Sequence, residues 1–170
     1  MIRNAHPDEF SALGQLMVKV YSQLEGFPKP SEQPAYYSLL ANIGDFAAKP
    51  STELLVAIFN DGTITGGVVY FGEMAYYGSG GSATAEKDAA GFRLLAVDPD
   101  SRGSGLGKLL VEECIHRARA AGRQQVIIHS TLSMQTAWKM YERMGFRRSP
   151  DLDFLQGELP VFGFRLLLDK

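Results

Sequence analysis

Residues 97–110 have the sequence VDPDSRGSGLGKLL, in which an apolar strand turns through a Pro/Asp corner into a glycine-rich helix start. The first N–H groups of a helix have no acceptor within the helix, and with the positive end of the helix dipole they attract anions. Glycines at 103, 105 and 107 would let phosphates approach this backbone without meeting side chains. We therefore predict a phosphate-binding turn, with a capping turn that binds nothing as the alternative.

Two common phosphate-binding patterns do not fit this turn. The loop of nucleoside triphosphatases, Gly-x-x-x-x-Gly-Lys-Ser/Thr, would need a glycine at Arg102 and a hydroxyl residue at Leu109. The dinucleotide-binding turn, Gly-x-Gly-x-x-Gly, fails because its last position falls on Lys108 or Leu110, depending on which glycine is counted first. Triphosphate hydrolysis and nicotinamide or flavin binding are therefore disfavoured.

Length and composition limit the possible classes of protein. The 170 residues are 45% hydrophobic and 21% charged, which suffices for one sizeable core, so we expect a single domain over residues 1–170. The net charge is −2 and the basic residues are scattered, which disfavours nucleic acid and anionic membranes as partners. The start lacks the apolar segment of a signal peptide, and no run of about 18 apolar residues follows, so a cytoplasmic location is expected.

The cysteine and histidine residues do not predict a metal site. Cys114 is the single cysteine, which excludes an internal disulfide and a thiolate cluster, and its spacing from apolar neighbours places it on the buried face of a helix. His6, His116 and His129 lie far apart in sequence and lack the spacing of zinc ligands. No metal is expected.

The spacing of apolar and turn residues predicts the order of elements along the chain: a strand at 2–5, helices at 6–24 and 33–48, paired strands at 54–59 and 64–71, a long mobile loop at 72–90, a strand at 92–97, a helix at 104–121, a strand at 125–129, a helix at 133–144 that Ser133 could cap, and a strand at 162–168. The Asn60-Asp61-Gly62 turn makes the first pair an antiparallel hairpin. Strand, glycine turn, helix and strand form a right-handed βαβ unit with parallel strands. The fold class is therefore α/β, with a mixed sheet and helices on both faces.

Two motifs resemble one family. Residues 102–107, RGSGLG, fit Arg-x-x-Gly-x-Gly, and residues 137–146, AWKMYERMGF, fit Ala-x-x-Leu-Tyr-x-x-x-Gly-Phe with Met140 in place of leucine. Both patterns, in this order, resemble the GNAT superfamily of N-acetyltransferases, in which the first is the acyl-CoA pyrophosphate loop. The resemblance implies a GNAT-like mixed central sheet with a splayed parallel pair. Without it, Tyr141 could simply be a core residue, since it shares an apolar helix face with its neighbours.

The resemblance also implies how acetyl-CoA would bind. The strand at 94–97 would carry a bulge and splay away from the strand at 126–129, so that the pantetheine arm could bond to its backbone. Main-chain N–H groups of residues 103–108 would hold the pyrophosphate, and Arg102 and Lys108 could add charge. The binding residues implied are Leu95, Ala96, Val97, Arg102, Gly103, Ser104, Gly105, Leu106, Gly107, Lys108, Ala137 and Tyr141.

The chemistry of the family assigns roles to two groups. An unprotonated amine attacks the acetyl carbonyl directly in a ternary complex, an oxyanion forms, and the CoA thiolate leaves. This needs a deprotonated amine, a donor near the oxyanion and a proton for the thiolate. A phenol with a pKa near 10 is protonated at neutral pH, so Tyr141 is assigned as the general acid. The backbone N–H of Val97 is assigned as the oxyanion donor.

The general base and the acceptor site are less defined by the sequence. Of the acids outside the cofactor half, Glu25, Glu53, Glu73, Glu86 and Asp88, the best placed is Glu73, at the end of a strand; action through ordered water is the alternative. An aromatic acceptor wall is predicted from Tyr21, Tyr36 and Tyr77, with Tyr37, Tyr76 and Trp138 as further members. Where relatives often begin the last helix with an asparagine this chain has Met134, and Thr131 or Ser133 would have to substitute.

The leading hypothesis is an acetyl-CoA-dependent N-acetyltransferase acting on a primary amine of a small molecule. Residues 145–153 resemble bacterial members of the small-molecule branch. The alternatives are a protein or peptide N-acetyltransferase and a non-catalytic acyl-CoA-binding module. The identity of the amine, the acyl chain length, and a monomeric or homodimeric state stay open, because residues 161–168 fit either an internal strand or a dimer edge.

Overall fold

The glycine-rich turn joins strand β4 (Ala89–Val97) to helix α3 (Leu106–Ala120) in the computed structural model, which describes residues 1–168. The strands form one sheet in the order β1-β2-β3-β4-β5-β8-β6, and β7 pairs with β8 beside this path. The remaining strands are β1 (Ile2–Asn4), β2 (Thr52–Ile58), β3 (Ile64–Phe71), β5 (Gln125–Ser130), β6 (Arg147–Arg148), β7 (Phe154–Gln156) and β8 (Leu159–Leu167). The remaining helices are α1 (Phe10–Ser22), α2 (Pro34–Ala41) and α4 (Gln135–Arg143).

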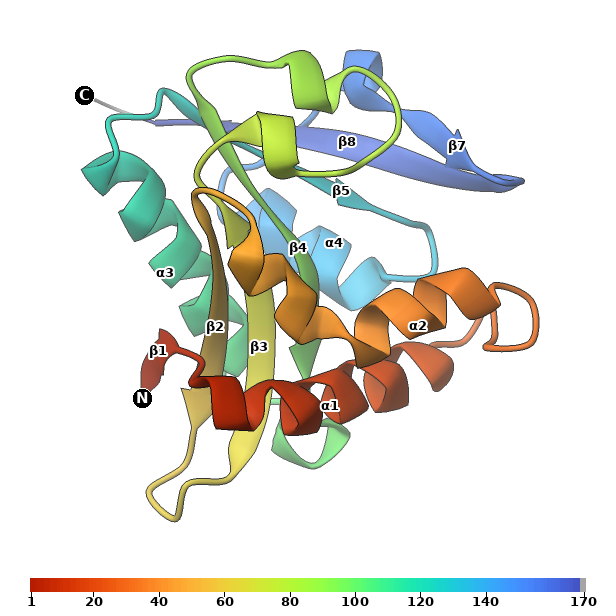
Figure 1. The fold of residues 1–170 in the computed structure, drawn as a ribbon. Helices are drawn as coiled ribbons and strands as arrows, with labels where there is room; N and C mark the ends of the chain where they lie inside the picture. Colours follow the sequence, from red (N-terminus) through yellow and green to blue (C-terminus); the bar gives the residue numbers. More distant parts are fainter. Residues whose placement is uncertain (169–170) are drawn as a thin grey trace.

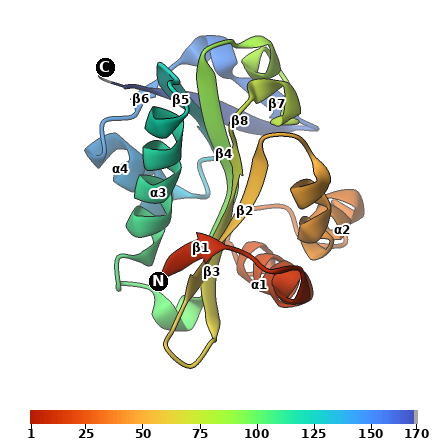
Figure 2. The ribbon, with the colours of Figure 1, turned by 60° about the vertical axis from the view of Figure 1, so that its left-hand side comes forward.

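The helices cover the two faces of the sheet in pairs. Helices α1 and α2 lie on one face, and α3 and α4 lie on the other (Figures 1 and 2). The alternation of side chains along the strands divides the core accordingly: Val69 and Ile127 pack on the α1/α2 face, whereas Val68 and Val126 pack on the α3/α4 face. The predicted mixed α/β sheet with helices on both faces is confirmed.

The hairpin between β2 and β3 forms as predicted. The two strands are antiparallel, Phe59 N–H bonds to the Thr63 carbonyl oxygen (3.0 Å), and the Asp61 carboxylate accepts a hydrogen bond from Thr63 N–H (3.0 Å). Gly62 has a φ of 88°, which glycine adopts without strain.

Strands β4 and β5 are paired along only part of their length. The parallel ladder joins residues 89–91 to residues 125–127 and then stops. Leu94 has a φ of 61°, and the register between β3 and β4 shifts beside it, so β4 carries a bulge. After the bulge β4 stays with β3, while β5 continues alongside β8. The predicted bulge and splay are confirmed, and they open the middle of the sheet.

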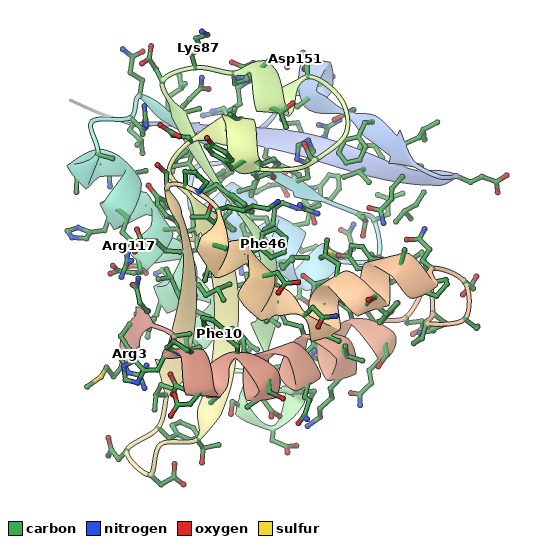
Figure 3. The ribbon with its side chains drawn as sticks, viewed as in Figure 1. Arg3, Phe10, Phe46, Lys87, Arg117 and Asp151 are labelled. Atoms are coloured by element: carbon green, nitrogen blue, oxygen red, sulfur yellow. The ribbon has the colours of Figure 1, made fainter. Side chains whose placement is uncertain are left out.

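The second predicted helix is shorter than expected. Helix α2 ends at Ala41, and residues Ile43–Ala48 form a 3₁₀ helix, because Asn42 leaves helical geometry and its side-chain amide donates to the Ser38 carbonyl oxygen (2.8 Å). Phe10, labelled in Figure 3, lies at the start of α1. It is so close to Gly44 that a Cβ on Gly44 would be 2.5 Å from the Phe10 ring. The prediction of one helix over 33–48 is therefore wrong in its second half.

The segment 72–90 is more ordered by packing than the sequence suggests. It contains 3₁₀ helices at Met74–Tyr76 and Ala83–Ala85, and Met74, Tyr77 and Ala83 are buried. It is also tied to the connection between β6 and β7: the Ser82 hydroxyl donates to the carbonyl oxygen of Asp151 (3.0 Å), a residue labelled in Figure 3. The interpretation as a long mobile loop missed this, because short apolar stretches between glycines show no periodicity.

The C-terminal strand is internal to the sheet. Strand β8 pairs with β5 along one edge and with β6 and β7 along the other. Of the two readings of residues 161–168, the internal strand is correct, and strands β6 and β7 are additions that the sequence did not predict. None of the helices formed by residues 1–168 is both long and apolar enough to cross a bilayer.

Candidate active site

A cleft of about 830 Å³ passes through the sheet where β4 and β5 diverge. Its wall on the α3/α4 face, which we call the glycine-turn half, consists of Ser101, Arg102, Gly103, Gly105, Leu106, Gly107, Lys108, Ala137, Met140, Tyr141, Arg143 and Met144. Its wall on the α1/α2 face, which we call the aromatic half, includes Tyr21, Phe27, Tyr36, Tyr77, Arg93, His129, Phe154 and Gln156. The bulged part of β4, residues 94–97, lies between the two halves.

The glycine turn has the backbone geometry of an anion site. Gly103 and Gly105 have φ values of 82° and 81°, so both use conformations that L residues rarely adopt. The first helical hydrogen bond of α3 runs from Leu109 N–H to the Gly105 carbonyl oxygen (3.1 Å). The N–H groups of residues 106–108 precede it and have no acceptor within the helix. They line the cleft together with the exposed cations of Arg102 and Lys108.

Two side chains of this half differ from the sequence-based assignment. Ser104 does not line the cleft, because its hydroxyl bonds back to the Ser101 carbonyl oxygen. Arg143 lines the cleft and was not predicted. Its position three residues after Met140 on α4 was the available signal, since residues three apart share a helix face.

The bulged strand offers backbone groups to the cleft. Asp98 N–H bonds to the Thr65 carbonyl oxygen (2.8 Å), so the antiparallel alternation turns the N–H and C=O of Val97 away from β3, to the side where β5 has separated. The Leu95 carbonyl oxygen accepts the hydroxyl of Tyr21 (3.0 Å), which ties the bulge to α1. Ser130, at the end of β5, lines the same gap, and its buried hydroxyl has no hydrogen-bond partner within residues 1–168.

Tyr141 is held in an aromatic cluster on α4. Its ring packs against Phe92 (5.9 Å between centroids) and Phe146 (5.7 Å), and only 5% of the residue is exposed. Burial raises the pKa of Tyr141 above its ordinary value, and the nearby Tyr77 adds to the rise. Its hydroxyl bonds to no other group of the described chain. The cleft is therefore lined by a phenol that stays protonated at neutral pH and is free to donate.

Thr131 and Ser133 also line the cleft, and their hydroxyls are bonded to each other (2.7 Å). Ser133 therefore does not cap α4.

The aromatic half contains the three tyrosines predicted for it. Tyr21, Phe27 and Tyr36 form a triangle with centroid distances of 5.6, 5.7 and 6.3 Å, and burial raises the pKa of Tyr36 to about 12. Tyr77 also lines this half of the cleft. The other aromatic candidates lie elsewhere: Tyr37 donates to the Pro28 carbonyl oxygen (2.7 Å), and neither Tyr76 nor Trp138 lines the cleft.

A short hydrogen-bond chain runs behind Tyr77. The Tyr77 hydroxyl lies 2.9 Å from His129 Nδ1, and His129 Nε2 lies 2.9 Å from the Leu152 carbonyl oxygen. Because a carbonyl oxygen only accepts, Nε2 carries the proton, and Nδ1 of the neutral imidazole accepts the proton of Tyr77. Burial lowers the pKa of His129, which keeps the ring neutral at neutral pH.

The cleft lacks the carboxylate base that the sequence suggested. Glu73 is exposed ahead of the 3₁₀ helix at Met74–Tyr76 and does not line the cleft, and neither do Glu25, Glu53, Glu86 or Asp88. Glu86, for example, is paired with Arg165 (2.6 Å). In the described chain, every charged side chain that lines the cleft is basic.

Arg93 and His129 are site residues that sequence reasoning missed. Both stand on strands whose neighbours are apolar, and both point to the α1/α2 face. A polar residue inside an apolar strand was the available signal. Burying a polar side chain costs free energy unless it has a hydrogen-bond or charge partner. Phe27, Phe154 and Gln156 gave no comparable signal, since they come from loops and a short strand that only the fold brings together.

Comparison with known proteins agrees with this geometry. Residues 17–146 match the model of the acetyltransferase (GNAT) family. The chain belongs to the GNAT family. An uncharacterized N-acetyltransferase of Escherichia coli K12, YjgM, is 30% identical over 116 residues, which cover 66% of this chain and 68% of that protein. A mycothiol acetyltransferase of Gordonia bronchialis is 38% identical over 55 residues, which cover 32% of this chain and only 18% of that relative's length.

Solved GNAT structures share the fold along nearly the whole chain. The PaiA N-acetyltransferase of Thermoplasma acidophilum in complex with coenzyme A superposes with a TM-score of 0.75 at 13% identity, covering 99% of this chain and 98% of that one. A GNAT acetyltransferase of Staphylococcus aureus Mu50 gives 0.72 at 16% identity and covers 99% of both chains. The GNAT fold expected from the two sequence motifs is confirmed.

Proposed function

We propose that this GNAT protein is an acetyl-CoA-dependent N-acetyltransferase that acetylates a primary amine of a small molecule by direct attack in a ternary complex. The observation that carries the proposal is one continuous cleft through the splayed sheet. One half of it is lined by the glycine turn and a protonated phenol, and the other half is lined by aromatic side chains. Two substrates entering from opposite faces would meet at the bulge of β4.

The glycine-turn half fits coenzyme A in three respects. The N–H groups of residues 106–108 suit a pyrophosphate, with Arg102, Lys108 and Arg143 adding positive charge. The backbone of Leu95, Ala96 and Val97 lies beside a gap without a neighbouring strand and suits the amides of pantetheine. The buried hydroxyl of Ser130, which has no hydrogen-bond partner within residues 1–168, is available to a polar group of a ligand. The CoA-bound structural relative from Thermoplasma acidophilum supports this assignment.

Acetyl-CoA supplies an acetyl group activated as a thioester. In the assigned roles, Tyr141 donates its hydroxyl proton to the sulfur as the carbon–sulfur bond breaks and the carbon–nitrogen bond forms. The N–H of Val97 donates a hydrogen bond to the carbonyl oxygen, where negative charge accumulates. Burial raises the pKa of Tyr141, so the phenol carries a proton at neutral pH, as this role requires.

Tyr77 and His129 take the place that the sequence gave to Glu73. The amine would donate its proton to the Tyr77 oxygen while the Tyr77 proton passes to His129 Nδ1. The resulting imidazolium keeps its Nε2 hydrogen bond to the Leu152 carbonyl oxygen. The support is that Tyr77 and His129 both line the cleft and that the neutral Nδ1 of His129 accepts a hydrogen bond from the Tyr77 hydroxyl. Proton transfer through ordered water is the alternative.

A small acceptor is favoured over a peptide by a contact between the walls of the aromatic half. The side-chain amide of Gln156 on β7 donates to Gln33 Oε1, just ahead of α2, at 2.8 Å. This bond joins the α2 side of the aromatic half to β7, where an extended peptide would need an open groove.

The test is the release of CoA from acetyl-CoA by the intact protein with a panel of amino acids, polyamines, aminoglycosides and peptides. The proposal expects release with at least one small amine, and intersecting initial-rate patterns, since both substrates bind before reaction. Tight acetyl-CoA binding without release for any amine would contradict it and favour the non-catalytic acyl-CoA-binding module. Release with peptides alone would favour the peptide acetyltransferase.

A further inference from the structure

The two halves of the cleft differ in how their charge is arranged. Four permanently cationic side chains line the cleft within the described residues, and no aspartate or glutamate does. Arg102, Lys108 and Arg143 belong to the glycine-turn half, where phosphates would lie. Arg93 is the one cation of the aromatic half, on the opposite face of the sheet, and the phosphate site does not account for it.

Arg93 faces the aromatic pocket directly. It sits one residue before the bulge of β4, and its guanidinium carbon lies 5.8 Å from the centre of the Tyr77 ring. Its positive charge acts on the groups around it, opposing the rise that burial causes in the pKa of Tyr21, Tyr36 and Tyr77. The guanidinium therefore lies beside Tyr77 and lines the same half of the cleft as Tyr21 and Tyr36.

Most of the hydrogen-bonding capacity of Arg93 is unused by the protein. Nη1 donates to the Tyr77 carbonyl oxygen at 2.9 Å, and this is its one side-chain hydrogen bond to the described chain. No carboxylate of residues 1–168 lies within 4.0 Å of it. A guanidinium has five N–H donors in a planar fork that matches a carboxylate. A partly buried cation without an opposite charge is costly, so its retention in a ligand cleft needs a reason.

We propose that Arg93 binds a carboxylate of the acceptor, so that the acceptor is an amino acid or a similar amino carboxylate; this inference rests on the proposed acetyltransferase function. The bond to the Tyr77 carbonyl oxygen fixes one edge of the guanidinium and leaves the other for the carboxylate. The aromatic triangle of Tyr21, Phe27 and Tyr36 then accommodates an apolar side chain. Polycationic amines, such as polyamines and aminoglycosides, are poor acceptors because the cleft offers them no anion.

The experiment compares amines that differ in one charge. CoA release is measured for each amino acid and for its α-carboxamide, and phenylalanine is compared with phenethylamine. Each rate is divided by the concentration of unprotonated amine, so that differences in amine pKa do not affect the comparison. For the best amino acid, kcat/KM should exceed that of its carboxamide by about ten- to a hundredfold, as expected for charge-assisted hydrogen bonds. Arg93→Gln should remove this preference by slowing the acid alone, and Arg93→Lys should keep part of it.

Two controls keep the result interpretable. Arg119→Gln removes an exposed arginine of α3 outside the cleft and should leave the preference unchanged. Acetyl-CoA binding by each Arg93 variant reports whether the fold is intact, and Arg93→Lys serves if Arg93→Gln does not fold. Equal use of acids and carboxamides by the wild-type protein, or an equal loss for both in Arg93→Gln, would overturn the carboxylate site and leave the acetyltransferase function standing.

Failure of the acetyltransferase function itself would look different. If no amine released CoA, the carboxylate site would be tested by thermal unfolding of the CoA-bound protein with amino acids and their carboxamides. Stabilisation by the acids alone, lost in Arg93→Gln and kept in Arg119→Gln, would support it. No stabilisation of the wild-type protein would overturn it.

Discussion

The glycine-turn half and the aromatic half of the cleft are built from different parts of the chain in different ways. The first comes from one continuous strand, turn and helix start, residues 94–108, together with one face of α4, and it offers mainly backbone N–H groups. The second is assembled from side chains of α1, α2, β4, β5, β7 and the connections between them. Backbone geometry suits the part of a reaction that a family shares, whereas converging side chains suit the part that each member adapts.

The largest effect is expected at the point where the two halves meet. Tyr141→Phe removes the proton donor while keeping the ring that packs on Phe92 and Phe146. Because general acid catalysis contributes roughly a hundredfold or more, kcat should fall by about that factor, and the KM for acetyl-CoA should change little. Steady-state kinetics check this. An equal loss in acetyl-CoA affinity, or unchanged turnover, would show that Tyr141 is only a packing residue.

The second prediction tests the aromatic half through its pH dependence. Burial lowers the pKa of His129 below 6.5, so Nδ1 is available at neutral pH and is lost as the pH falls through that lowered pKa. Plotted against pH, log kcat/KM for the amine should rise with a slope of one near neutral pH, because the amine itself loses a proton. At acid pH the slope should steepen toward two, because His129 must also lose its proton. His129→Gln should lower kcat/KM by about ten- to a hundredfold and lose the steeper limb.

If proton transfer runs through ordered water instead, the pH profiles of kcat/KM for the wild-type protein and for His129→Gln would be parallel and nearly equal. Tyr77→Phe provides the matched variant for the same chain, since it removes the hydroxyl that reaches His129 and keeps the ring that lies beside Arg93. Tyr77→Phe should resemble His129→Gln in the size of the loss in kcat/KM and in the shape of the pH profile.

The third prediction tests whether the glycine-turn half works through its backbone. Gly105→Ala puts a side chain on a residue with φ near 81°, which costs about 1–2 kcal/mol of strain, although nothing lies within 4 Å to clash with it. The KM for acetyl-CoA should rise about tenfold, and kcat should change less. Gly62→Ala in the β2/β3 hairpin is the matched control, because its φ of 88° gives similar strain far from the cleft. It should lower thermal stability without changing the KM, and equal kinetics in the two variants would contradict the assignment.

These two kinds of construction also explain what the sequence revealed. The turn and the Tyr141 helix were predicted, because glycine spacing and helix periodicity are local properties that the residues themselves specify. The bulge beside Leu94 was expected only from the resemblance to the family, since no local pattern in the strand indicates it. Arg93 and His129 were missed as site residues, because their function depends on α1, β7 and the segment after β3 converging on them. Glu73 was assigned as base from its place at a strand end, but the chain turns it outward into solvent.

Dependence on tertiary contacts also explains why the sequence-based fold was wrong for residues 72–90. Met74, Tyr77 and Ala83 are buried, and the segment that contains them is bonded to the C-terminal part of the chain at Asp151. No periodic pattern of apolar residues over 72–90 predicts this burial. The break of the second helix at Asn42 likewise reflects a side-chain bond that competes with the helix, and propensity alone did not predict it.

A smaller effect is expected at the contact between the walls of the aromatic half. Gln156→Ala removes the hydrogen bond to Gln33 that joins β7 to the α2 side. The KM for a small amine should rise a few-fold, because a neutral hydrogen bond contributes about 1 kcal/mol, and the KM for acetyl-CoA should not change. Peptides that are poor acceptors for the wild-type protein should improve. A larger change in acetyl-CoA affinity than in amine affinity would contradict the division of the cleft into two halves.

The smallest effect is expected at Glu73. Because it is exposed and outside the cleft, Glu73→Gln should leave kcat, both KM values and the pH profile within a factor of about two of the wild-type values. A loss comparable to that of His129→Gln would restore the carboxylate base that the sequence suggested.

The most direct test of the central claim, that one cleft joins a donor half to an acceptor half, is a crystal structure of the protein with coenzyme A. We predict pyrophosphate oxygens within about 3 Å of the N–H groups of residues 106–108, as hydrogen bonds require, and the sulfur next to the Tyr141 hydroxyl. The thiol should point through the gap beside Val97 toward Tyr77 and Arg93. Phosphates bound away from the glycine turn, or a sulfur that does not reach Tyr141, would contradict the account.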